Sequence, residues 1–217
     1  MKRIYVSGIF GAILLAFALA IVGCSEESEE PVEVRAEIQV GVDDGGVSVF
    51  THYLPDTLFG FINGVSEGSF CGTVVSGGGD TLTTRVYYRF DISEWDGGDI
   101  VFHGQCIEKF GSPTAIEVYV IDGFTQFPDT AQGPLDVSGY WNLIQNGVKV
   151  GAVMPNSGDW FAVTVPDSVV LQKKTASNYL AFLLKLEDES SATDVYTVST
   201  YEYAEGHNSP KPYLSWE

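Results

Sequence analysis

The sequence predicts an all-β protein, with a jelly-roll-type antiparallel β-sandwich after an N-terminal lipoprotein signal peptide and an acidic tether. Two observations carry the fold class. Apolar residues alternate with polar ones at every second position, and clusters of Gly, Pro, Asp and Asn separate these runs. Beyond the tether, about 180 residues are enough to bury one core, and no internal repeat is visible. We therefore expect a single domain over residues 36–217.

The chain begins like a secretory signal peptide. Lys2 and Arg3 precede a mostly apolar run that ends in the tetrad "IVGC" at residues 21–24. This run is nearly long enough for a membrane span, so an uncleaved anchor helix is the alternative. The tetrad resembles the bacterial lipobox. That resemblance implies that residues 1–23 are removed and that Cys24, carrying a diacylglyceryl group, becomes the first mature residue. Several acyl chains anchor a protein that a single chain holds only weakly.

The predicted tether, residues 24–35, contains the acidic run "SEESEEPVEV". Like charges repel and remain solvated, so this segment would hold the domain away from the bilayer. Without Lys2 and Arg3 the mature chain keeps 9 basic residues against 29 acidic ones, a net charge of −20. This balance argues against nucleic acid or an anionic lipid surface as a partner. Neutral sugars, cations and basic proteins remain compatible.

Eight strands are expected. In "RVYYRFDIS" (85–93), Val86, Tyr88, Phe90 and Ile92 share one face, and the intervening residues share the other. The other runs with the same alternation are 36–42, 99–107, 115–121, 159–165, 179–186, 194–203 and 212–216. The segment "DVSGYWNLIQNGV" could contain a helical turn or lead into a further short strand. Eight strands is about the number in a β-sandwich.

Three stretches resemble the DNRLRE-type domain. They are "RVYYRFDISEWDGGDIVFHGQCIEKF", "SNYLAFLLKLED" and the carboxy-terminal "TYEYAEGHNSPKPYLSWE". The resemblance covers about residues 36–217. It implies a jelly-roll sandwich similar to carbohydrate-binding modules, of the kind found in adhesion or glycan-binding parts of secreted proteins. Residues 51–80 depart from the pattern, because they lack its usual short Asn-Gly segment.

The sequence argues against an enzyme. "GVSEG" (64–68) matches the G-x-S-x-G motif and would make Ser66 a nucleophile, but that motif needs a strand-to-helix elbow, and strand-like residues follow here. His52, His103 and His207 are scattered and form no helical zinc motif. We expect no cofactor. A structural calcium ion is compatible with such sandwiches, although the sequence assigns no ligands and the metal question stays open.

Two cysteines remain once Cys24 is lipidated. Cys71 and Cys106 form an even pair in an exported domain, which predicts a disulfide. It would close a loop of about 35 residues and contribute roughly 3–4 kcal/mol to stability. The alternative is two buried free thiols that act as small apolar groups.

Aromatic residues in loops are the candidate ligand-binding residues. Tyr140 and Trp141 are adjacent and flanked by Gly139 and Asn142, which suggests a loop where one ring could stack on a sugar. The second candidate pair is Tyr201 and Tyr203, expected on one face of a strand. Trp160, Phe182 and Trp216 are expected in the core, and Trp95 at one end of the sandwich.

Two functions remain open. The first is an envelope lipoprotein, lipid-anchored on the exported side of a bacterial membrane (the outer membrane if the cell has one), whose non-catalytic sandwich binds glycan or a cell-surface partner. The second is an assembly lipoprotein that docks onto another envelope protein and binds no sugar. A long aromatic-lined groove would favour the first, and a flat apolar patch of several hundred Å² the second.

Overall fold

The computed structural model describes residues 33–217, except for 52–57, 63–66, 76–78, 128–137 and 191–192. Glu33–Glu217 forms one compact unit. The predicted signal peptide, Cys24 and most of the predicted tether lie outside the described residues, as do Ser66 and His52. Within the described part of the chain, no helix is long and apolar enough to span a bilayer.

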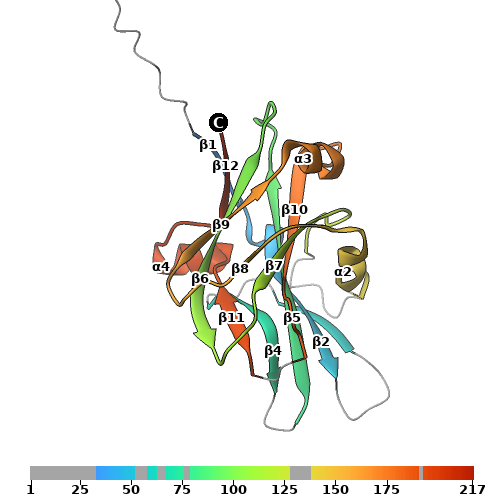
Figure 1. Ribbon diagram of the computed structural model, residues 1–217, viewed down its shortest axis with the longest axis vertical. Helices are drawn as coiled ribbons and strands as arrows, with labels where there is room; N and C mark the ends of the chain where they lie inside the picture. Colours follow the sequence, from blue (N-terminus) through green and yellow to red (C-terminus); the bar gives the residue numbers. More distant parts are fainter. Residues whose placement is uncertain (1–32, 52–57, 63–66, 76–78, 128–137, 191–192) are drawn as a thin grey trace, which may run out of the picture. The chain divides into compact units, whose positions relative to one another are not determined.

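The described unit is mostly antiparallel β-sheet, which confirms the predicted all-β, sandwich-like fold (Figure 1). Its strands are β1 (Val34–Glu37), β2 (Asp44–Thr51), β3 (Leu58–Ile62), β4 (Ser69–Val75), β5 (Thr81–Asp91), β6 (Ile100–Phe110), β7 (Ile116–Ile121), β8 (Val148–Val153), β9 (Trp160–Val165), β10 (Tyr179–Leu186), β11 (Val195–Val198) and β12 (Tyr213–Trp216). Its helices are η1 (Gly41–Asp43), α2 (Ser138–Trp141), η3 (Asn142–Asn146), α3 (Asp167–Lys173) and α4 (Tyr201–His207).

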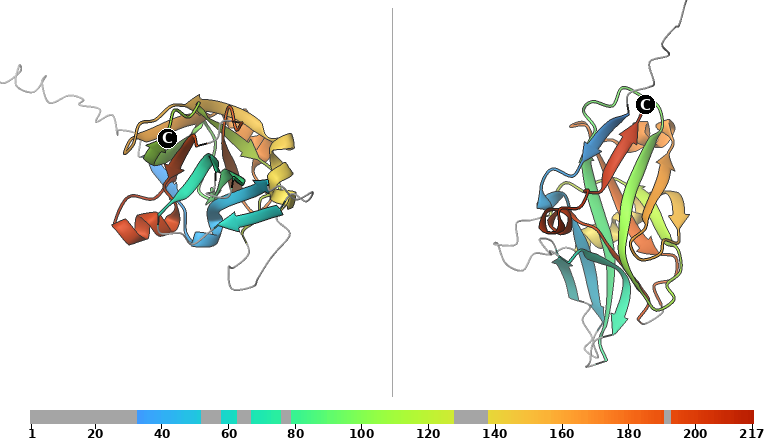
Figure 2. Two further views of the ribbon diagram at one scale, coloured as in Figure 1. Left: turned by 90° about the horizontal axis from the view of Figure 1, so that it is seen from below. Right: turned by 90° about the vertical axis from the view of Figure 1, so that its left-hand side faces the viewer.

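The strands form two sheets that share β6. The first sheet has the order β1-β12-β6-β9. The second continues from β6 through β11, β4, β5, β10 and β7 to β8, and β2 with β3 pairs along β5. Ile100–Gln105 of β6 pairs with β9, whereas the end of β6 pairs with β11. Because β6 belongs to both sheets, the two sheets are joined along this strand. Figure 2 shows the sheets curving around a common interior.

The main core lies between the two sheets. As the alternation predicts, Val86, Tyr88, Phe90 and Ile92 are all buried in it. Phe102 of β6 lies among aromatic rings from both sheets, and its centroid is 4.8 Å from that of Phe182 in a stacked pair. The predicted burial of Phe182 and Trp216 is confirmed, and Trp95, expected at one end of the sandwich, also packs in the main core.

A second apolar cluster covers the outer face of the second sheet. Tyr87 and Leu183 point away from the main core and are nevertheless fully buried. Phe124 and Phe127, which follow β7, pack on them together with residues of α2 and η3. Both faces of β5 are therefore covered, so Tyr87 does not lie on the solvent-exposed face that simple alternation suggests.

Two predicted strands end early. The strand expected over 36–42 stops at Glu37 and is followed by η1. The strand expected over 194–203 stops at Val198, because Thr200 caps a helix: its Oγ1 accepts a hydrogen bond from Tyr203 N at 3.3 Å. Helix α4 then ends at Asn208, whose backbone is left-handed with φ 51°. Strands β2, β3 and β4 lie outside the eight expected segments, and β8 begins at the end of the segment 136–148, for which a helical turn or a further short strand was expected.

Candidate functional site

The outer face of the first sheet presents side chains from four strands in register. One cross-strand row contains Ala162, His103, Tyr213 and Glu37, one residue from each strand. Trp160 of β9 lies opposite Gln105 of β6 in the neighbouring row. Because alternate residues of a strand point to one face, these side chains share the surface opposite to the main core. The set Arg35, His103, Gln105, Trp160, Ala162 and Tyr213 is called the aromatic face.

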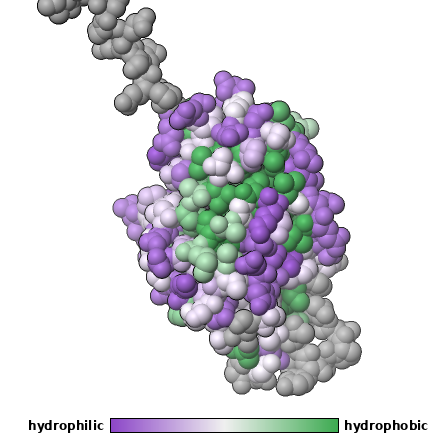
Figure 3. Space-filling model, viewed as in Figure 1, coloured by the Kyte–Doolittle hydropathy of each residue, from purple (hydrophilic) through white to green (hydrophobic). Residues whose placement is uncertain are grey.

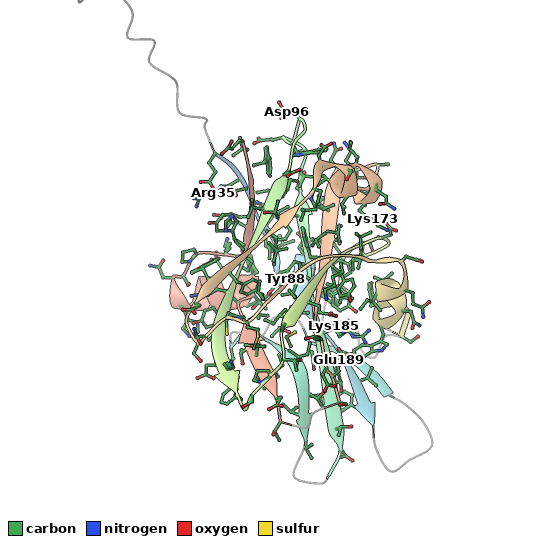
Figure 4. The ribbon with its side chains drawn as sticks, in the orientation of Figure 1. Arg35, Tyr88, Asp96, Lys173, Lys185 and Glu189 are labelled. Atoms are coloured by element: carbon green, nitrogen blue, oxygen red, sulfur yellow. The ribbon has the colours of Figure 1, made fainter. Side chains whose placement is uncertain are left out.

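Three side chains of the aromatic face stack across adjacent strands. The His103 and Tyr213 rings are nearly parallel, at 8°, and their centroids are 4.2 Å apart. The Arg35 guanidinium lies 4.7 Å from the Tyr213 ring centre, and Figure 4 shows Arg35 at the edge formed by β1. Neighbouring strands contribute these groups, so Tyr213 has Arg35 on one side and His103 on the other. Tyr213 is held rigidly, but both of its ring faces are occupied.

Trp160 differs from its neighbours because its ring is open to solvent. It is 38% exposed, and its centroid lies 5.9 Å from that of Tyr213 at 48°. Its neighbour on the same face of β9 is Ala162, which is small and exposed. A rigid indole beside a small residue is suited to stacking against the apolar face of a flat ligand. Gln105, opposite Trp160, can supply hydrogen bonds to ligand hydroxyls.

Arg35 is the charged residue of the aromatic face, and the carboxylates of Glu33 and Glu37 lie near it. Arg35 forms an ion pair with Glu33, with Nη2 and Oε2 2.8 Å apart. Burial lowers the pKa of His103, Glu33 opposes this change, and Arg35 adds to it. Burial therefore favours the neutral form of the imidazole. Its Nε2 shares a hydrogen bond of 2.9 Å with Ser215 Oγ.

Tyr140 and Trp141, the first predicted pair, lie in α2 rather than in a loop and cover the second apolar cluster. The Tyr140 hydroxyl donates to Gln126 O at 3.0 Å, and its ring packs on Phe124 and Phe127. The Trp141 ring lies 3.8 Å from the Arg85 guanidinium. Both side chains thus have packing partners and are half-buried.

Tyr201 and Tyr203 do not share a strand face, because both belong to α4. Residues two apart on a helix point in widely different directions. Tyr201 packs on the main core and lies beneath Lys211 Nζ, 4.5 Å from its ring centre. Tyr203 stacks on His207, one turn later, at 4.3 Å. The structure therefore does not bring the two predicted pairs together, and neither pair contributes to the aromatic face.

The predicted disulfide between Cys71 and Cys106 is wrong, because both residues are buried free thiols. Strand β11 lies between their strands, with Tyr196 opposite Cys71 and Val198 opposite Cys106. Two strand spacings amount to about 9.5 Å, beyond the roughly 7 Å between Cα atoms that a disulfide can bridge. Burial raises the pKa of the Cys106 thiol to about 11. Both residues serve as small apolar groups of the core.

Charged side chains on the outer face of the second sheet are paired with one another. Arg85 donates from Nε and Nη2 to the two oxygens of Glu189, at 2.9 and 2.7 Å. Lys185 Nζ lies 2.9 Å from Glu117 Oε2, and Figure 4 labels Lys185 and Glu189. Burial raises the pKa of Glu117, but hydrogen bonds from Lys149, Lys185 and Tyr119 outweigh it and bring the pKa to about 2. These groups join α2 and the loop after β10 to the sheet.

The residues of the aromatic face were missed, and Trp160 was wrongly placed in the core. A signal was present: in "WFAVTV" one alternate set is Phe161, Val163 and Val165, and the other contains Ala162 and Thr164 beside Trp160. The second set is the less apolar one and lies outward. The contact between His103 and Tyr213 could not be predicted from the local sequence, because it depends on the pairing of β6 with β12.

No group of three or more His, Cys, Asp or Glu side chains within the described ranges is arranged to hold a metal ion. A structural calcium ion stays a prediction from the sequence. No protein-family model and no curated protein matches this chain. The resemblance to the DNRLRE-type domain likewise stays a prediction.

Proposed function

We propose that this chain is an envelope lipoprotein, lipid-anchored through Cys24, whose non-catalytic sandwich binds glycan through the aromatic face. The observation that carries the proposal is Trp160, an indole 38% exposed on a sheet face. It lies beside a rigid Tyr213 and opposite Gln105. Trp and Tyr are enriched at binding surfaces, because a rigid ring supplies a large contact area at low entropic cost beside hydrogen-bonding groups.

Neutral sugars suit this surface better than charged ones. The Arg35 charge is largely compensated by Glu33, and the mature chain as proposed carries a net charge of −20. A strongly anionic glycan would meet Coulomb repulsion with little local compensation. Affinity would come from stacking on the Trp160 ring and from hydrogen bonds to Gln105 and neighbouring polar groups.

The lipid anchor is tested at Cys24. Cys24→Ser should leave an unprocessed precursor, because the serine hydroxyl cannot replace the thiol that the acyl chains would modify. Mass spectrometry of the membrane fraction should find the diacylglyceryl mass on the wild-type amino terminus and an intact leader in the variant. A Cys24→Ser chain still cleaved before residue 24 would contradict lipidation.

The binding proposal is tested at Trp160. Trp160→Ala in the full-length chain, purified in detergent and applied to a glycan array, should weaken binding about 30-fold or more, as expected when a central aromatic contact of about 2 kcal/mol is lost. The melting temperature should change by only a few degrees, since a surface substitution alters stability by about 0.5 kcal/mol.

Leu171→Ala is the matched control, because Leu171 is also an exposed apolar residue but belongs to α3. It should bind like the wild type. Unchanged binding by Trp160→Ala, or silence of the wild type across the array, would count against the proposal.

The second candidate is docking onto another envelope protein, and an apolar area favours it. Figure 3 shows apolar side chains gathered around β8 and β9 on the face seen in Figure 1. Exposed residues there include Ala152, Ala162 and Met154, the last 65% exposed. Silence on the array, together with loss of a crosslinked envelope partner in Met154→Asp, would favour this candidate.

A further inference from the structure

A cavity separate from the aromatic face lies over the outer face of the second sheet. It is a cavity of about 170 Å³ lined by Arg89, Phe124, Thr125, Thr175, Ser177 and Tyr179. Arg89 comes from β5 and Tyr179 from the start of β10, whereas the rest belong to the segments after β7 and α3. None of these residues belongs to the aromatic face, which lies on the first sheet.

The walls of this cavity are fixed by hydrogen bonds and packing. Tyr179 N donates to Thr175 Oγ1 at 3.0 Å, and Thr175 N donates to Tyr179 O at 2.8 Å. Asn178 closes this turn with a left-handed backbone, φ 59°. On the other side Phe124 is buried, with its ring centroid 4.9 Å from that of Phe127. A cavity that needs no rearrangement avoids much of the entropic cost of binding.

Arg89 gives the cavity hydrogen-bond donors without net charge. Its Nε and Nη2 both contact Asp43 Oδ1, at 2.8 and 2.6 Å, so the carboxylate neutralises the guanidinium. Its guanidinium also lies 4.1 Å from the Tyr179 ring centre. Among the described residues, Arg89 Nη1 has no hydrogen-bond acceptor, so it can donate to a ligand.

The rim supplies hydroxyl groups. Thr125, Thr175 and Ser177 are exposed at the mouth of the cavity. The Thr175 hydroxyl accepts from the backbone and keeps its own hydrogen for donation. The cavity is thus lined by two aromatic residues and by neutral donors and acceptors, which can contact the apolar and the hydroxyl-bearing parts of a sugar ring.

We propose that this cavity binds one neutral pyranose unit. Its volume lies well below the roughly 300–1,000 Å³ of pockets for drug-sized ligands, so a single ring is the largest occupant that fits. A charged sugar is disfavoured, because Asp43 already neutralises Arg89. This site is independent of the aromatic face, and the proposal holds whether or not that face binds glycan.

The test uses ligand-observed saturation-transfer NMR on the full-length chain in detergent, with the methyl glycosides of glucose, galactose, mannose and N-acetylglucosamine as probes. A ligand of about 13 heavy atoms at about 0.3 kcal/mol per atom binds with a Kd near 1 mM. At least one probe should saturate in that range. The double variant Thr125→Val with Ser177→Ala removes two exposed hydroxyls and should weaken that probe about tenfold or more.

Phe110→Ala, at the exposed end of β6, is the control and should leave the probe's Kd unchanged. Thermal melts should show that the double variant folds like the wild type. No saturation by any probe up to about 50 mM would overturn the proposal, since so weak a contact is not a site. The proposal would also be overturned if the probe still bound the double variant but no longer bound Trp160→Ala. That result would assign the sugar to the aromatic face and leave the proposed function intact.

Discussion

Phe102→Ala is expected to lower the free energy of unfolding by about 3–5 kcal/mol, the usual cost of truncating a buried Phe. The Phe102 ring is fully buried and packs against rings from both sheets. Its loss would leave a cavity between β5, β6 and β10 that rigid neighbouring rings cannot fill. For a domain of this size the melting temperature should fall by roughly 10 °C or more, measured by near-UV circular dichroism.

Two variants separate cavity formation from other causes. Phe102→Leu keeps most of the volume and should cost less than about 1.5 kcal/mol. Phe110→Ala makes the same chemical change on the same strand, but Phe110 is 49% exposed, so its effect should stay within about 0.5 kcal/mol. Equal losses of unfolding free energy in Phe102→Ala and Phe110→Ala would mean that the inner face of β6 is not packed between the sheets.

The fold was predictable where the alternation of apolar and polar residues in a strand is set only by the core on which one face of the strand packs. Val86, Tyr88 and Phe90 alternate because one face of β5 covers the main core. Tyr87 lies on the other face, as the alternation predicts, but its burial was not predicted, because a separate segment, containing Phe124, returns to cover it. Nothing in the β5 sequence encodes that segment. Helix α4 was predictable in principle, since Thr200 is a good N-cap and Asn208 a good terminator.

The candidate sites were less predictable, because they depend on pairing between distant strands. His103 meets Tyr213 only through the register of β6 with β12. The same non-local pairing separates Cys71 from Cys106, because β11 lies between their strands. The even number of remaining cysteines and the predicted exported location suggested a disulfide, but neither gives the order of the strands in the sheet. Arg89 and Tyr179 likewise form a cavity only because β10 pairs with β5.

Raising the pH from about 4 to 7 is expected to destabilise the protein through Asp44. This carboxyl is fully buried at the start of β2. Its Oδ2 accepts a hydrogen bond from Tyr201 N at 2.7 Å, but its Oδ1 has no hydrogen-bond partner in the described part of the chain. Burial raises the pKa of Asp44 well above its usual value, and the nearby Glu202 and Asp43 carboxylates raise it further against the effect of the Tyr201 N–H.

The sign follows from proton linkage. With a pKa higher in the folded than in the unfolded state, Asp44 contributes most stability below its unfolded pKa of about 3.9. That contribution is lost as the pH rises toward the folded pKa, by up to about 1.4 kcal/mol per pH unit. Glu117 acts in the opposite direction. Its pKa of about 2 means that its contribution is lost only as the pH falls below about 4.5.

Asp44→Asn isolates the effect, because the amide oxygen can still accept from Tyr201 N but the side chain never ionises. Urea unfolding should show the variant more stable than the wild type by about 2 kcal/mol or more at pH 7, with the difference shrinking toward pH 4. Asp43→Asn removes the same charge one residue earlier, but it also breaks the ion pair with Arg89 and should destabilise the protein at pH 7. Stabilisation by both variants would point to general charge repulsion. If the difference in unfolding free energy between Asp44→Asn and the wild type does not change with pH, Asp44 does not titrate over this range.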